Sequence, residues 1–385
     1  MTEKKIPFVG LHAHSVAGSI FDAIGYPDEH MDFCYENGGE ALALTDHGNM
    51  NGFSHQFLHW QKMKSEGKEF KPIFGVEAYF LPSIDEWRDD YNRIKEDAKL
   101  AKSLAKEGDT SGATVEDEEA SKKAVKNILN RRRHLVLLAQ NQTGLNNLFK
   151  LISESYKEEN FYRYPRVDYK LLDKYSEGVI ASSACLGGPY AGNYWANREE
   201  GPEAVREAMR ETSRQFVKIF GDRWYGELQW NNIPEQHELN QYIIETSKEF
   251  DITLISTADS HYPNNEAWKD RELYKRLGWL GKGTPAWAED NTELPDGVEE
   301  IGYELYPKNG NQMWDAYKYY SKTGGFEYDD QLVMDSITET HNIAFNRIED
   351  FVPDTTVKLP DFVVPAGFTD AEALVNYALE GLRQR

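Results

Sequence analysis

Two histidines near the start of the chain, His12 and His14, stand one residue apart after a short apolar run. In a β-strand successive side chains alternate between faces, so these two imidazoles point the same way and can bind one ion. The same spacing recurs late in the chain at Asp259 and His261. A pair of histidines on a solvated strand face would have no such role. The choice between a ligand pair and a solvated face depends on whether other ligand types stand at matching places.

Other candidate ligands lie at or just after the ends of apolar runs, where parallel α/β proteins carry functional groups. Glu77 and Glu227 instead lie inside their runs, and His134, like His12, lies near the start of one. The candidate metal ligands are His12, His14, Asp22, His47, Glu77, His134, Cys185, Asp259 and His261. Imidazole, carboxylate and one thiolate suit zinc, with manganese, iron or magnesium as alternatives. This set exceeds one tetrahedral shell, so we expect two or three divalent metals.

The chemistry expected of such a cluster is phosphoester hydrolysis. Clustered divalent metals lower the pKa of a bound water from about 15.7 toward roughly 7 and stabilise charge on the oxygens of a phosphoester. A carboxylate can bridge two metals, and we assign that role to Glu77. The expected catalytic residues are His12, His14, Glu77 and Asp259. Arg166 is a candidate ligand of a substrate phosphate.

Several of these polar residues have structural alternatives. Asp46 precedes a Gly-Asn turn and can cap it, which leaves His47 as the better ligand. Cys185 follows an apolar strand and could be an inert core thiol. Glu227 could support a ligand or pair with a basic residue. His55 and His59 share a helix face but lack a converging carboxylate, so we expect both to be structural.

The composition limits the classes of function. The chain has 385 residues with 43 Lys and Arg against 65 Asp and Glu, a formal net charge of -22. This balance argues against nucleic-acid binding through a broad basic surface, although carboxylate-bound metals can still receive a phosphate. No apolar run approaches the roughly 18 residues that span a bilayer. With only two cysteines, we expect a cytoplasmic protein without a membrane partner.

The hydrophobic pattern predicts strands that alternate with helices. Expected strands cover residues 8–15, 40–49, 71–79, 134–139, 178–188, 224–230 and 252–262, and expected helices cover 27–37, 52–65, 143–155, 202–220 and 236–250. About seven units, each a strand followed by a helix, favour a parallel α/β architecture, and a barrel is its closed form. The fold class expected is therefore a distorted α/β barrel with a helical C-terminal extension.

Three parts of the chain differ in pattern. Residues 1–270 carry the expected barrel, interrupted at 84–130 by a Lys- and Glu-rich insertion that predicts an exposed helical hairpin or a disordered excursion. Residues 271–350 are predicted to be a helical and loop extension, with a helix at 335–347. Residues 351–385 combine a proline-bearing linker with a final helix that begins at 370. Because the sequence stops within that helix, we expect a fragment or one part of a split protein.

Five motifs, in order along nearly the whole chain, resemble the PHP (polymerase and histidinol phosphatase) domain family. They are Leu11–Ser15, Ala43–Met50, Gly75–Tyr79, Ser183–Gly188 and Ala258–Tyr262. The form they resemble most is the one found at the N-terminus of the alpha subunits of bacterial DNA polymerase III. The stretch Leu359–Pro365 is similar to the join between that domain and the polymerase palm.

This resemblance implies a distorted (β/α)7 barrel with a trinuclear metal site, and all nine candidate ligands match the family pattern. In members that keep every ligand it implies metal-dependent 3′–5′ exonuclease activity in proofreading, with the DNA 3′ end as substrate. Members that have lost ligands keep the domain as a structural support. The alternatives are therefore a docking module for a separate polymerase palm and fingers fragment or another replisome chain, and a histidinol-phosphatase-like enzyme of small molecules. No palm follows Arg385, so we expect no polymerase activity from this chain alone.

Overall fold

The computed structural model describes residues 5–106, 131–279, 304–357 and 362–384. The chain divides into two compact units, Met1–Phe351 and Val352–Arg385. The first unit contains every strand of the described residues and all the candidate ligands. Much of the predicted 84–130 insertion, residues 107–130, lies outside the described residues, and its first part is the helix α3 (Ile84–Lys106).

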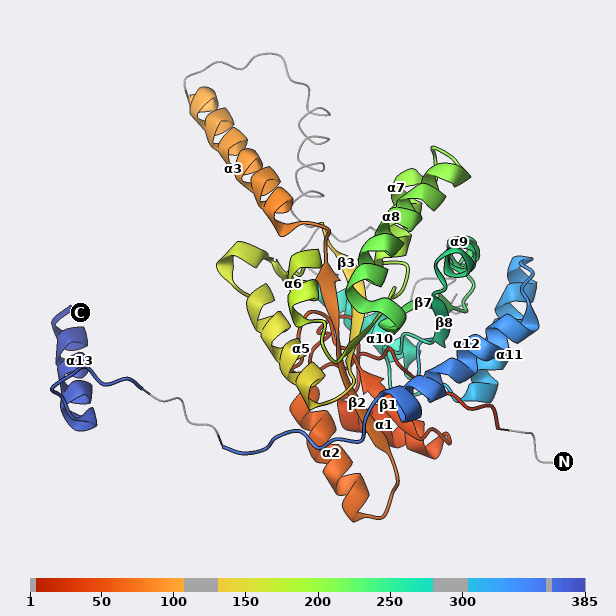
Figure 1. Ribbon diagram of the computed structural model, residues 1–385, viewed down its shortest axis with the longest axis horizontal. Helices are drawn as coiled ribbons and strands as arrows, with labels where there is room; N and C mark the ends of the chain where they lie inside the picture. The colour runs from red at the N-terminus through yellow and green to blue at the C-terminus, as the bar shows by residue number, and fades with distance from the viewer. Residues whose placement is uncertain (1–4, 107–130, 280–303, 358–361, 385) are drawn as a thin grey trace. The chain divides into compact units, whose positions relative to one another are not determined.

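A six-stranded mixed sheet forms the centre of the first unit (Figure 1). Its strands, in spatial order, are β1 (Ala41–Leu44), β2 (Lys71–Phe80), β3 (Arg133–Ala139), β6 (Val179–Ser182), β7 (Trp224–Gln229) and β8 (Thr253–Thr257). Each overlaps a strand predicted from its apolar run, although β1, β6 and β8 are shorter than predicted. Because helices cover the sheet, these runs are apolar almost throughout rather than alternating with polar residues.

The N-terminal segment joins the two edges of this sheet. Gly10 bridges to Leu42 of β1, and Ala13 bridges to Ser260, just beyond β8. Backbone hydrogen bonds run from His14 N to Ser260 O (2.7 Å) and from Ser260 N to His12 O (3.0 Å). The sheet is therefore closed into a distorted α/β barrel, as predicted. The expected regular strand at residues 8–15 is instead an extended segment with isolated bridges.

The expectation of an all-parallel sheet is wrong for β3. This strand runs antiparallel to β2, with Glu77 opposite Val136 and Tyr79 opposite His134, and antiparallel to β6 on its other side. The segment between β2 and β3 starts with α3 at the C-terminal end of β2. Strand β3 begins at that same end of the sheet. The chain therefore has to run back along β2 instead of crossing over to begin a parallel strand.

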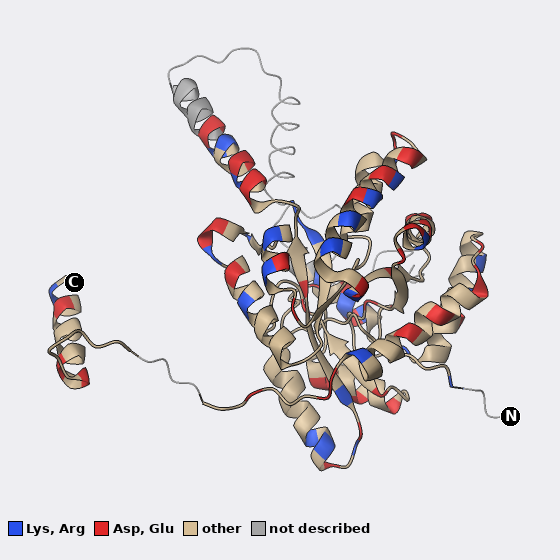
Figure 2. Ribbon diagram, viewed as in Figure 1, with Lys and Arg blue, Asp and Glu red and all other residues tan. Residues whose placement is uncertain are grey.

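The predicted helices form where expected. They are α1 (Pro27–Glu36), α2 (Phe53–Ser65), α5 (Gln142–Ser155), α8 (Pro202–Phe220) and α9 (Pro234–Phe250). In α8, Pro202 occupies the first turn, and Val205, Met209 and Phe216 lie on a buried stripe. The opposite face of α8 carries interspersed acidic and basic residues (Figure 2).

Further helices complete the first unit. They are α6 (Tyr169–Tyr175), α7 (Pro189–Asn197), α10 (Trp268–Trp279), α11 (Gly310–Gly324) and α12 (Asp330–Asn342), the last continued by a π-helical turn at Ile343–Arg347. Helix α12 packs on β8, where the hydroxyls of Ser256 and Ser336 lie 2.7 Å apart. Thr340 of the same helix accepts a hydrogen bond from the backbone of Val9. The C-terminal helices thus support the segment that closes the barrel.

The second unit contains the helix α13 (Asp370–Gln384), within the final helix expected from the sequence. Its first turn is capped by Thr369, whose hydroxyl and backbone N–H both donate to Glu372 at 2.8 Å. Among the described residues, no helix combines the length and the apolar character needed to cross a membrane.

Candidate metal centre

His12 and His14 project into the barrel from the segment that closes it. Both side chains are fully buried, and their ring centroids lie 5.1 Å apart. Their Nε2 atoms each lie 3.2 Å from Oδ1 of Asp259. The alternation of an extended backbone therefore does place the two imidazoles together, beside a carboxylate from the opposite edge of the sheet.

Glu77 lies at the centre of the cluster. Its Oε2 is 2.8 Å from Nδ1 of His47 and 3.1 Å from Nε2 of His14, and its Oε1 is 2.8 Å from Nδ1 of His134. Although Glu77 is inside the β2 run, β1 pairs with β2 only as far as Leu44 opposite Phe74. Glu77 therefore stands beyond the end of its shorter neighbour, at the level of His47.

His134 reaches the same end of the barrel because β3 runs in reverse. The start of an antiparallel strand lies beside the C-terminal ends of its neighbours, so a ligand near a strand start joins ligands that follow strand ends. Cys185, in the loop after β6, places Sγ 3.7 Å from Nδ1 of His134. Burial, and the nearby Asp259 and Glu77 carboxylates, raise the pKa of the Cys185 thiol well above its ordinary value.

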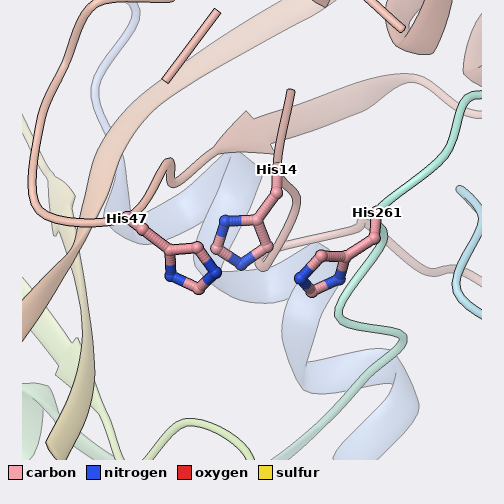
Figure 3. A group of neighbouring side chains, drawn as sticks. All are labelled: His14, His47 and His261. Carbon is pink, nitrogen blue, oxygen red and sulfur yellow. The ribbon is translucent and has the colours of Figure 1, made fainter. Parts of the chain in front are cut away.

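Asp22 and His261 complete the cluster on its other side. Oδ2 of Asp22 lies 3.0 Å from Nε2 of His47 and 3.4 Å from Nε2 of His261. His14, His47 and His261 come from three different segments and point toward one another (Figure 3). The His14 ring centroid is 4.2 Å from that of His47 and 4.4 Å from that of His261. All nine candidate ligands thus belong to one connected group.

Several buried polar atoms of this cluster have no hydrogen-bond partner. Within the described parts of the chain, the unpartnered buried side-chain atoms of this group are Nε2 of His12 and His14, Nδ1 of His47, both carboxylate oxygens of Glu77, and Oδ1 of Asp259. Unsatisfied buried atoms of this kind are costly, and native structures rarely keep several in one place. Imidazole nitrogens and carboxylate oxygens that face one another at this spacing fit divalent cations.

Three triads in the cluster have the spacing of metal sites. They are His14, His47 and His261; His12, His14 and Glu77; and His47, Glu77 and His134, with the ligand atoms of each triad within 4.8 Å of one another. His14, His47 and Glu77 each belong to two triads. This sharing is the geometry expected of a site with more than one metal, because a shared carboxylate can bridge two ions.

The charges of the cluster favour cation binding. Burial opposes ionisation of Glu77, but His134, His47 and His12 outweigh it and hold the pKa of Glu77 well below its usual range. For His47, burial is likewise outweighed by Glu77 and Asp22, which raise its pKa to about 10. The Glu77 carboxylate is therefore ionised, and without a metal His47 takes up a proton in its place.

Neighbouring residues hold the ligands in position. Glu227 lies with Oε1 at 2.7 Å from Nδ1 of His12 and accepts hydrogen bonds from Ser182 and Thr257 at 2.6 Å. This contact directs Nε2 of His12 into the cluster, as expected of a supporting carboxylate. Asp46 accepts hydrogen bonds from the backbone and the hydroxyl of Ser15 at 2.7 and 2.9 Å. Both carboxylates are buried, and both act on the segments that carry ligands.

Arg271 of α10 is a supporting residue that the sequence did not indicate. Its guanidinium donates to Oδ1 of Asp22 at 2.8 Å and to the backbone carbonyl of Asp22 at 2.6 Å. The distance of α10 from Asp22 along the chain hides this pairing, since a single arginine in a helical stretch carries no pattern. Asp22 is thereby fixed from two sides, by Arg271 and by the imidazoles.

Comparison with known proteins agrees with this geometry. The model of the PHP domain matches residues 10–231. The chain belongs to the PHP domain family. Every described strand of the barrel except β8, and every candidate ligand except Asp259 and His261, lies within the matched residues. β8 and the helices that follow it lie after the matched residues.

The curated relatives that this PHP domain resembles are alpha subunits of DNA polymerase III. It is 34% identical over 380 residues to the DNA polymerase III subunit alpha of Aquifex aeolicus, covering 98% of this chain and 28% of that protein. It is 30% identical over 380 residues to the DNA polymerase III subunit alpha of Borreliella burgdorferi, covering 98% of this chain and 27% of that protein. The chain thus spans little more than a quarter of the length of these relatives.

Solved structures give a more distant likeness. A histidinol phosphate phosphatase from Lactococcus lactis, complexed with zinc, L-histidinol and phosphate, aligns over 71% of this chain and 93% of its own. The sequence identity is 12% and the TM-score is 0.30. These values are too low for any argument about the chemistry of this PHP domain.

Arg166 does not have the position expected of a phosphate ligand. It is fully buried, and its guanidinium donates to the backbone carbonyls of Arg131, Tyr162 and Tyr164 at 2.8–3.2 Å while stacking 4.2 Å above the Trp87 ring. These contacts support the loop after β5 (Tyr164–Pro165). The structure therefore gives Arg166 a structural role in the PHP domain.

The histidines that were expected to be structural have partners away from the centre. Nε2 of His59 lies 2.9 Å from Asp32, and the His55 ring stacks on Tyr26. His237 contacts the hydroxyl of Tyr328 at 2.8 Å. Helical spacing of four residues therefore brings His55 and His59 onto one face without adding them to the metal cluster.

The open side of the cluster lies between Asp22 and His134. Their side chains are 37% and 25% exposed, whereas the other histidines and carboxylates of the cluster are at most 11% exposed. Near His134, the guanidinium of Arg132 lies 3.8 Å above the Tyr164 ring and 5.1 Å from the Tyr79 ring. Tyr79 in turn stacks beside His47. A cation and two aromatic rings therefore flank the opening.

Proposed function

We propose that this PHP domain binds two or three divalent metals and hydrolyses phosphodiesters at the 3′ end of DNA, as a 3′–5′ exonuclease that proofreads for a replicative polymerase. The observation that carries the proposal is the group of buried, unpartnered imidazole and carboxylate atoms around Glu77. The proposed ligands are His12, His14, Asp22, His47, Glu77, His134, Cys185, Asp259 and His261. The similarity to DNA polymerase III alpha subunits supports DNA as the substrate.

The residues of the site would have separate roles in catalysis, in holding the ligands and in attracting the substrate. Divalent metals in such a site supply an activated water at neutral pH and neutralise charge on the phosphate. Glu227 holds the His12 ring, and Arg271 holds Asp22, so both ligands keep their orientation while substrate binds. Arg132, at the opening, is placed to attract the DNA backbone toward the centre. His12, His14, Glu77 and Asp259, which are nearest the middle of the cluster, are the proposed catalytic residues.

A nuclease assay tests the proposal directly. Purified protein reconstituted with Mn²⁺ or Zn²⁺ is incubated with a 5′-labelled single-stranded oligonucleotide, and we expect a ladder that shortens from the 3′ end. Chelation with EDTA and the substitution His14→Ala should each abolish it. His59→Ala is the matched control, because His59 contacts Asp32 away from the centre and its loss should leave the ladder unchanged. Intact oligonucleotide in every metal condition, with metal bound, would overturn the proposed nuclease.

A second function is favoured by the surface of α13. In this helix Leu374, Val375 and Leu382 are exposed, which is unusual for three large apolar side chains on one short helix. As a docking module, the chain would use this helix to bind a separate polymerase palm and fingers fragment or another replisome chain. Gel filtration with such a fragment should show a complex that Leu374→Glu weakens. A replication role of either kind would place the protein in the cytoplasm, where bacterial DNA is copied.

A small-molecule phosphatase of the histidinol-phosphate kind would use the same cluster. Hydrolysis rates on p-nitrophenyl phosphate and on single-stranded DNA separate the two activities. We expect DNA to be preferred, because the opening carries the cation and the aromatic rings that a polymeric substrate can use. A clear preference for the monoester would favour the phosphatase.

A further inference from the structure

One residue beside the metal centre has an unusual combination of backbone and side chain. Phe21 precedes Asp22 and adopts a left-handed conformation with φ of 63°. Glycine and asparagine occupy this region readily, whereas a bulky residue there is rare. The Phe21 side chain is nevertheless 47% exposed, so it does not recover the cost of its backbone by burial in the core. Local strain of this kind, held in place next to a site, points to a function for the side chain.

The Phe21 ring is fixed in place. It stacks on Tyr274 of α10, with ring centroids 5.3 Å apart and planes inclined by 30°. The same helix supplies Arg271, which holds the backbone carbonyl and the carboxylate of Asp22. Helix α10 therefore positions a ligand of the centre and, one turn further along, the ring that supports Phe21. Both the ring and the ligand are therefore contacted by the same helix.

Phe21 is next in sequence to a ligand at the open side of the cluster. Asp22 is one of the two exposed ligands between which the opening lies, with a side chain 37% exposed against 25% for His134. A partly exposed aromatic ring next to this opening presents a flat apolar face to whatever approaches the metals. Nucleobases stack on such faces whatever their sequence, because every base has a π-face.

We propose that Phe21, supported by Tyr274, is a stacking platform for the base of the 3′-terminal nucleotide. This inference rests on the proposed nuclease function and adds to it the way the substrate end is positioned. It makes Phe21 a binding residue for the base, while the phosphodiester is held at the metal cluster. Since stacking is independent of base identity, the platform suits an exonuclease that must accept any terminal base.

Binding measurements test the platform without requiring hydrolysis. Two oligonucleotides are compared in the presence of Ca²⁺, one with a normal 3′-terminal base and one with an abasic 3′ end. Stacking on one aromatic residue is expected to give the wild-type protein about a tenfold preference for the normal end. Phe21→Ala should reduce that preference to less than about twofold. Phe21→Trp should retain it.

The controls separate stacking from changes in the loop. Phe21→Gly relaxes the left-handed backbone and should lose the preference as Phe21→Ala does, while its metal content, measured by elemental analysis, stays at the wild-type value. Leu58→Ala removes an exposed apolar side chain on α2 and should not alter the preference. If the variants at position 21 weaken binding of both ends equally, or of neither, the platform is wrong.

A fluorescent base gives an independent reading. 2-Aminopurine at the 3′ end should be quenched on binding to wild-type protein and much less on binding to Phe21→Ala. A wild-type protein that binds and quenches this base but releases no nucleotides would overturn the nuclease and leave the platform supported. If the wild-type protein releases nucleotides, but Phe21→Ala quenches 2-aminopurine as strongly as the wild type does, the platform is wrong and the nuclease is supported.

Discussion

Nδ1 of His12 and Oε1 of Glu227 lie 2.7 Å apart in a part of the barrel where both side chains are fully buried. The carboxylate therefore selects which nitrogen of His12 carries its proton, and leaves Nε2 to face the metal cluster. Glu227→Gln should weaken metal binding about 10- to 100-fold, as loss of an outer partner of a metal-bound histidine does. Competition with a coloured chelator measures this change.

The matched control for Glu227→Gln is Glu245→Gln. Glu245 pairs with Arg206 on the exposed surface between α8 and α9, so the same chemical change there should leave metal affinity unaltered. Equal affinities for the wild type and Glu227→Gln would mean that the orientation of His12 does not depend on Glu227.

Substitution of Glu77 should have a larger effect. Because its two oxygens contact imidazoles of His14, His47 and His134, Glu77→Gln removes the charge common to two of the triads. We expect metal affinity to fall by at least about 100-fold, more than for an outer partner, and nuclease activity to fall with it. Elemental analysis and the oligonucleotide assay should be carried out on the same preparation. Full metal content in Glu77→Gln would contradict the central position given to this carboxylate.

Metal binding should release protons. In the metal-free protein, Glu77 and Asp22 outweigh burial and raise the pKa of His47 to about 10, and the pKa of His12 is also raised, by Asp259, Glu227 and Glu77. A metal binds the neutral imidazole, so these protons have to leave. Affinity should therefore rise with pH, roughly tenfold per unit for each proton released. Calorimetry in two buffers of different ionisation enthalpy measures the number of protons, and a heat that is the same in both would contradict the prediction.

The stability of the metal-free protein should fall as the pH rises. An imidazole with a folded-state pKa above its unfolded value stabilises the fold fully below pH about 6.5, and this contribution is lost as the pH passes through the folded-state value. For His47 the loss extends from about pH 6.5 to about pH 10, at a limiting slope of about 1.4 kcal/mol per unit. Thermal unfolding in EDTA at two pH values tests this, and His47→Gln should flatten the dependence. A midpoint that increases with pH would contradict it.

Arg166→Ala should reduce stability rather than catalysis. The substitution leaves the carbonyls of Tyr162 and Tyr164 without their donor and opens a space beside Trp87. We expect a loss of about 1–3 kcal/mol in the free energy of unfolding for each buried carbonyl left without a donor. Arg214→Ala, on an exposed ion pair with Glu211, should cost less than about 1 kcal/mol. Denaturant titration measures both, and a specific rise in the KM for DNA with unchanged stability would restore a substrate role to Arg166.

The residues show why much of this molecule could be predicted from its sequence. Apolar runs such as those of β2 and β8 follow directly from burial on both faces of a sheet, and they are read without knowledge of the tertiary structure. The spacing of His12 and His14 likewise depends only on the local alternation of an extended chain. The family motifs then supplied candidate ligands, such as Cys185, that spacing alone left ambiguous.

What the sequence could not provide depends on relations between distant segments. The reversal of β3 follows from where the chain re-enters after α3, and no local pattern in Arg133–Ala139 differs from that of a parallel strand. Arg166 and Arg132 both lie against aromatic rings in the structure. Only the tertiary structure shows that backbone carbonyls enclose Arg166. The pairing of Arg271 with Asp22 is equally invisible along the chain.

Because the segment around His12 closes the barrel, the metal centre can be completed only late in the synthesis of the chain. His12 is made early, yet its partner Glu227 follows 215 residues later. At about 5–20 residues per second, this interval lasts roughly 10–40 s. At the start of that time the first two imidazoles are on the growing chain before the strands that will surround them have been made. A complete metal centre can exist only once the last strand has been added, so the metal content of a newly made chain reports that its barrel has closed.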